Sequence, residues 1–69
     1  MKQENIIRNK MWDALNNQCN AIFPLEFYNK KELFENIPFD LKNVIVTVYI
    51  GKNNKGFDSY IFSFDKIFK

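Results

Sequence analysis

The sequence predicts an α+β domain in which an amphipathic N-terminal helix packs on a small antiparallel sheet. Three patterns predict it: helical periodicity in the first twenty or so residues, a short alternating segment around Pro24, and a β-branched and aromatic hairpin pattern over the last third. The chain has 69 residues, which is enough for one domain and too few for two. We therefore expect a single domain over residues 1–69, in the order helix, edge strand, short helix, two-stranded hairpin.

The first helix is expected to run from Gln3 to about Asn20. At about 100° per residue, apolar side chains gather on one arc and Asn and Asp side chains lie opposite. The apolar arc contains Ile7, Met11, Trp12, Ala14, Leu15 and Cys19. Pro24 disfavours helical conformation at the residue before it and so ends the helix. The arc predicts that Trp12 and Cys19 are buried in the core.

Two short elements are expected next. Residues 23–27 alternate between apolar and other side chains, which indicates a strand. Pro24 has no backbone N–H, so this strand belongs at the edge of the sheet. Asn29, followed three residues later by Glu32, predicts the N-cap of a short second helix that continues to Glu35.

The C-terminal hairpin is predicted from Val44–Ile50 and Phe57–Asp65, which are rich in β-branched and aromatic residues and flank a turn at Lys52–Gly56. Both segments carry apolar side chains at even-numbered positions: Val44, Val46, Val48, Ile50, Tyr60, Phe62 and Phe64. Paired residues lie on the same face, so even positions must pair with even ones, which a connection of three or five residues allows. We expect Gly56 to be left-handed and the even face to pack on the first helix.

The composition argues against an enzyme. The chain has no histidine, one cysteine and two glycines, so it lacks the commonest general base, the ligands of a structural zinc site and a glycine-rich phosphate loop. Four carboxylates are the remaining route to catalysis or to a magnesium site, and we interpret them as surface charges: Glu32, Glu35, Asp58 and Asp65. We expect no catalytic residue, no cofactor and no bound metal.

The sequence also predicts the compartment. No apolar run approaches the roughly 20 residues of a membrane helix, and residues 1–10 lack the apolar core of a signal peptide. Cys19 is the only cysteine, so no disulfide can form within the chain, which favours a reducing compartment. We expect a cytoplasmic protein with no membrane partner.

The odd-numbered face of the hairpin is the predicted binding surface. Aromatic residues make up 17% of the chain, and exposed apolar patches tend to mark interaction sites. The candidate partner-binding residues are Ile45, Tyr49, Lys52, Lys55, Phe57 and Ile61. The net charge of only +2 favours another protein as the partner. Aromatic rings beside lysines leave nucleic acid as the alternative, and a homodimer that uses this face is a third possibility.

The overall profile adds a resemblance. A chain this short, rich in Asn, Lys, Ile and Phe and without catalytic residues, is similar to small phage and mobile-element proteins, among them anti-CRISPR proteins. The resemblance implies a stoichiometric inhibitor or adaptor that occupies a surface of a host defence system such as CRISPR.

Overall fold

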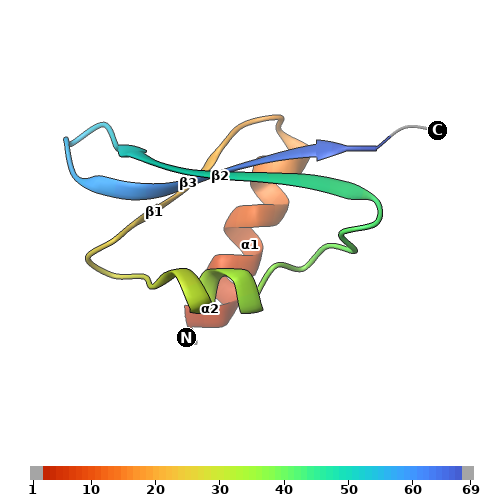
Figure 1. Cartoon of the computed structure of the whole chain (residues 1–69), viewed down its shortest axis with the longest axis horizontal. Helices are drawn as coiled ribbons and strands as arrows, with labels where there is room; N and C mark the ends of the chain where they lie inside the picture. The colour runs from red at the N-terminus through yellow and green to blue at the C-terminus, as the bar shows by residue number, and fades with distance from the viewer. Residues whose placement is uncertain (1–2, 68–69) are drawn as a thin grey trace.

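The computed structural model describes residues 3–67 and contains two helices and one three-stranded antiparallel sheet (Figure 1). The elements are α1 (Gln3–Asn16), β1 (Ala21–Pro24), α2 (Lys30–Glu35), β2 (Val44–Lys52) and β3 (Asp58–Lys66). The strand order is β1-β3-β2, so β3 is the central strand. This arrangement confirms the predicted α+β class and the predicted order of elements.

Helix α1 ends earlier than its periodicity predicted. Gln18 has a φ of 54°, and the N–H of Cys19 donates to the carbonyl of Ala14 at 2.9 Å. A left-handed residue followed by this six-to-one hydrogen bond is a Schellman motif, which satisfies the last carbonyls of the helix and redirects the chain. Cys19 therefore lies outside the helix and is exposed, so its predicted burial is wrong.

Trp12 is the second residue that the helical arc placed wrongly. Its side chain is 44% exposed and packs edge-on against Phe39, with ring centroids 4.7 Å apart. Trp12 is therefore a rim residue that covers the segment leading into β2.

Helix α2 has the predicted bounds, whereas the strand predicted over residues 23–27 is displaced: β1 spans Ala21–Pro24, and residues 25–27 form a turn. β1 begins two positions before the alternating segment did, and Ala21 and Phe23 pair with Phe62 and Tyr60 of β3. Pro24 lies in an edge strand, as expected. The Asn29 side chain caps α2 by accepting a hydrogen bond from the Glu32 N–H at 2.7 Å.

The hairpin register confirms the pairing of even positions with even ones. Val46 pairs with Phe64 and Val48 with Phe62, and the connection, residues 53–57, has five residues. Gly56 has a φ of 84°, the left-handed conformation that the turn requires. The Asn53 side-chain oxygen fixes the same turn by accepting hydrogen bonds from the Lys55 and Phe57 N–H groups at 2.9 and 3.0 Å.

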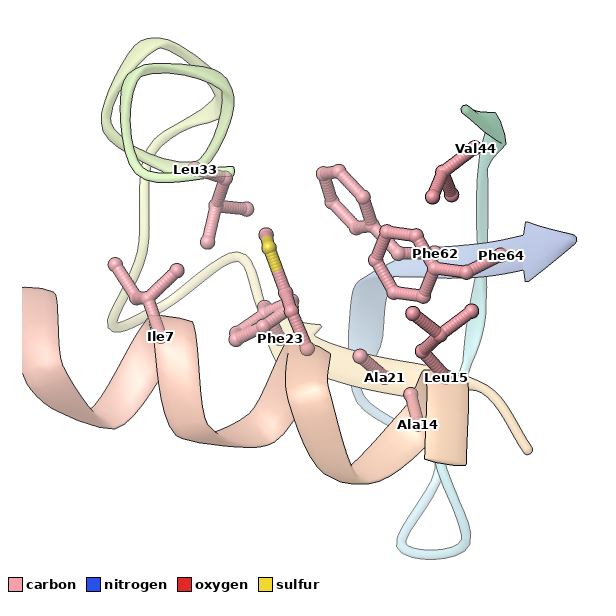
Figure 2. Packing of buried hydrophobic residues seen from close by; sticks show 10 residues of the cluster. Ile7, Ala14, Leu15, Ala21, Phe23, Leu33, Val44, Phe62 and Phe64 are labelled. Atoms are coloured by element: carbon pink, nitrogen blue, oxygen red, sulfur yellow. The ribbon is translucent and has the colours of Figure 1, made fainter. Parts of the chain in front are cut away.

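Both helices pack on the even face of the hairpin, which is therefore the core face. Figure 2 shows Leu33 of α2 pointing toward Ile7 of α1, while Phe62 and Phe64 of β3 lie over Leu15. All five side chains are buried. Ile50 is an exception on this face, with 63% exposure, because the turn end of the hairpin extends beyond α1 (Figure 1).

Replacement of Phe62 by alanine should destabilise the protein by about 3–5 kcal/mol, because it removes a fully buried ring and leaves a cavity. Ser63→Ala, the next residue on the opposite face, should change the free energy of unfolding little. Urea titrations of the two variants measure the difference, and equal losses would contradict the assignment of the faces.

Gly56→Ala should cost about 1–2 kcal/mol, since an L-residue is strained at positive φ. No atom lies within 4 Å of a Cβ placed there, so the whole loss reflects backbone conformation. Gly56→Asn should recover part of it because asparagine tolerates this conformation better. Thermal unfolding followed by circular dichroism measures both, and an unchanged midpoint for Gly56→Ala would refute the strain.

Candidate protein-binding surface

One face of the sheet, which carries the odd-numbered residues of the hairpin and the even-numbered residues of β1, is covered by no helix among residues 3–67, because α1 and α2 both pack on the opposite face. We call it the outer face. Its apolar side chains come from all three strands: Ile22, Pro24, Ile45, Tyr49 and Ile61. This face is where a partner could contact the sheet directly.

A cross-strand row forms the middle of the outer face. Ile61 of the central strand pairs with Tyr49 of β2 on one side and with Ile22 of β1 on the other. Between these neighbours Ile61 is only 8% exposed, whereas Tyr49 is 49% exposed. Ile61 therefore forms the floor of the patch, and Tyr49 supplies the accessible ring.

Gly51 makes room for this floor. A Cβ at Gly51 would lie 2.7 Å from the Cδ1 atom of Ile61 and 3.8 Å from a ring carbon of Tyr49. The Ile61 side chain therefore extends over the backbone of β2, where any larger residue would displace it. Ser59, the next outer-face residue of the central strand, is also buried, and its hydroxyl donates to the Phe57 carbonyl at 3.1 Å.

Ile45 extends the patch along β2. It lies four residues from Tyr49 on the same face, a separation of about 13 Å along an extended strand. Its side chain is more than half exposed, and Thr47 between them is exposed as well. These three residues form an accessible strip along one edge of the sheet.

Phe57 belongs to a neighbouring groove of about 560 Å³. Ile22 and Pro24 line this groove together with Phe27, Lys55 and Phe57, and both phenylalanines are more than half exposed. The sequence pattern missed Ile22 as a surface residue because it started β1 two positions late, and it missed Phe27 because it continued the strand through residues 25–27, which form a turn. The apolar pair Ala21–Ile22 directly before Phe23 was the available signal.

The two candidate lysines do not lie together. Lys52 occupies an even position, so its side chain lies on the core face of the hairpin, where Nζ is 3.6 Å from an Asp58 carboxylate oxygen. Lys55 lies in the turn and lines the groove beside Phe57. The structure thus brings Tyr49 and Ile61 together, continues them to Ile45, places Phe57 and Lys55 in the adjacent groove, and separates Lys52 from the rest.

The carboxylates are dispersed. Asp58 and Asp65 lie at opposite ends of β3, and Glu35 of α2 forms a solvent-exposed ion pair with Lys31 at 3.9 Å. In the part of the chain that the structure describes, no three His, Cys, Asp or Glu side chains are grouped as metal ligands. None of the helices within residues 3–67 has the length and apolar character needed to cross a bilayer.

Comparison with protein-family models, curated proteins and solved structures finds no match to this chain. The role of the outer face is therefore inferred from its own residues.

Gly51→Ala should rearrange the outer face and leave the core in place. The added Cβ would collide with Cδ1 of Ile61, the end of a flexible side chain that can rotate away, so we expect a stability loss of about 1 kcal/mol or less. Methyl and aromatic NMR spectra should show shifts at Ile61 and Tyr49 and unchanged signals at Ile7 and Leu33. Unshifted Ile61 and Tyr49 signals would contradict the close packing at Gly51.

Proposed function

We propose that this protein is a non-enzymatic module that binds another protein through the outer face of its sheet. The observation that carries the proposal is the accessible strip of Ile45, Thr47 and Tyr49, with Tyr49 beside the Ile61 floor, on a sheet face that no helix within residues 3–67 covers. Large apolar side chains exposed on an uncovered sheet face commonly mark an interaction site. Tyrosine is enriched among the residues that dominate binding energy.

The strip suits protein recognition because its backbone is rigidly held. Tyr49 and Ile45 lie in a strand that pairs along its length with β3, so little conformational entropy is lost when a partner covers them. The Phe57 groove lies at the β1 edge, across the central strand from the strip, and offers a site for an apolar side chain of the partner. The strip would provide contact area, and the groove across the sheet would provide a specific anchoring position.

The proposed role is that of a stoichiometric inhibitor or adaptor in the cytoplasm. A small domain can act in this way by occupying a surface, without chemistry of its own, which agrees with a chain that has no histidine and a single cysteine. The resemblance of its profile to small phage and mobile-element proteins suggests a host defence system, such as CRISPR, as the target.

Nucleic acid is the second candidate partner, favoured by the exposed rings of Tyr49 and Phe57 with Lys55 beside the latter. Base stacking on aromatic side chains together with phosphate contacts is the usual way to bind single strands. The position of Lys52 on the core face, paired with Asp58, leaves fewer free cations near the rings. We therefore rank this function below protein binding.

Tyr49→Ala should raise the dissociation constant for the partner about thirtyfold, the equivalent of ~2 kcal/mol. The thermal midpoint should hardly change, because the Tyr49 ring is half-exposed. Ile50→Ala is the matched control, since Ile50 is also exposed but lies on the other face. The partner is first isolated by pull-down from the native host, with and without nuclease treatment, and the variants are then compared by calorimetry.

The salt response separates the two candidate partners. A protein partner should bind with shallow salt dependence, whereas nucleic acid binding should weaken steeply as salt rises and should weaken further in Lys55→Ala. Equal affinities of Tyr49→Ala and Ile50→Ala for the isolated partner would contradict the outer face as the binding surface.

A further inference from the structure

The two edges of the sheet differ in how they are protected. Edge strands present unpaired N–H and C=O groups and are usually shielded by short length, proline or lysine. β1 has all three devices: it spans only Ala21–Pro24, Pro24 has no N–H, and Lys10 Nζ lies 3.4 Å from the Ile22 carbonyl oxygen. This edge is closed to further strand pairing.

The β2 edge is open. At one end of the hairpin the Asn53 N–H donates to the Phe57 carbonyl at 2.9 Å, and at the other the Ile67 N–H donates to the Asn43 carbonyl at 3.0 Å. Hydrogen-bonded positions alternate along an antiparallel pair, so odd-numbered residues of β2 bond to β3. The even-numbered residues, Val44 to Ile50, direct their N–H and C=O groups away from the sheet.

None of the devices that protect β1 is present here. The segment Val44–Ile50 contains no proline and no charged residue. Within residues 3–67, no side chain forms a hydrogen bond with the outward N–H and C=O groups of this segment. An apolar edge strand of this length in a stable protein calls for a partner strand.

We propose that this edge pairs with β2 of a second copy of the chain, antiparallel, about a two-fold axis at Thr47. The segment Val44–Ile50 is self-complementary in this register. Val44 lies opposite Ile50 of the second copy, Ile45 opposite Tyr49, Val46 opposite Val48, and Thr47 opposite Thr47. Each cross-strand pair joins two apolar residues or two threonines, the combinations that stabilise sheets.

The register also satisfies the open backbone groups. Val46 and Val48 both direct their N–H and C=O groups outward, so each such pair exchanges two hydrogen bonds across the axis. The same surface serves both copies, as a closed two-fold interface requires. The result is one continuous sheet in the order β1-β3-β2-β2-β3-β1, with all helices on one side.

Pairing at the edge leaves the outer face free and enlarges it. Ile45 of one copy would pack beside Tyr49 of the other, so two accessible strips become one surface across the axis. The proposed dimer therefore extends the proposed binding function, but its evidence is the unprotected edge and does not rest on the outer face having a partner.

Charge substitution at the axis tests the pairing. Wild-type protein should sediment at twice the mass of one chain. In the proposed register, Thr47→Lys or Thr47→Glu places two like charges directly opposite each other across the axis. Their repulsion should prevent pairing, so each variant alone should sediment as a single chain. An equimolar mixture of the two variants should restore the dimer, since the introduced lysine of one copy would then face the introduced glutamate of the other. Ser63→Lys, the matched control on the same face of β3, should remain dimeric.

A cross-link tests the register. In a Cys19→Ser background, Thr47→Cys should form a disulfide between copies under mild oxidation, because directly opposed residues of a non-hydrogen-bonded pair lie about 4.5 Å apart at Cα. Ser63→Cys in the same background should not. Any one of three results would overturn the proposal. These are a wild-type protein that sediments with the mass of a single chain, a Thr47→Lys variant that is dimeric on its own, and an equimolar mixture of Thr47→Lys and Thr47→Glu that stays monomeric. The first result would leave the edge to a strand of a different protein.

Discussion

The fold depends on the side chain of Phe62, which contacts aromatic rings from β1, α2 and β3. Its ring meets Phe23 of β1 edge-on at a centroid distance of 5.6 Å and Phe34 of α2 at 5.7 Å, and it stacks on Phe64 at 6.0 Å. Because β3 is the central strand, this one side chain lies between both neighbouring strands and beneath both helices. The positions of α2 and β1 follow from the need to cover it.

The small size of the chain explains why its two sheet faces differ so strongly. A domain of about 60–70 residues buries a limited share of its surface, and here both helices are used to cover one face. No helix within residues 3–67 packs on the outer face, where Ile61 is sheltered between Ile22 and Tyr49 of the neighbouring strands. Large apolar residues consequently remain accessible on β2 and around the turn.

The hairpin could be predicted in detail because residues 44–50 and 60–64 carry the same alternation, and because Gly56 allowed only a few turn geometries. The end of α1 could not, since the Schellman stop at Gln18 uses a residue without intrinsic preference for positive φ. The error at Cys19 and the late start of β1 both follow from that stop. The site was predicted only in part. The alternation of faces placed Tyr49 and Ile45 on one surface, as the structure has them, but Lys52 was assigned to the same surface although its even position places it on the core face. The burial of Ile61 depends on β1 and on Gly51, which no local pattern links to it.

The floor and the strip of the outer face would experience different evolutionary constraints. A Cβ at Gly51 would meet Cδ1 of Ile61, so a larger residue at position 51 requires the Ile61 side chain to move. Ile45, Thr47 and Tyr49 are exposed, so substitutions there disturb less packing than substitutions at Ile61 or Gly51. Changes of side chain along this one strand therefore alter the chemistry of the outer face while the scaffold beneath it is preserved.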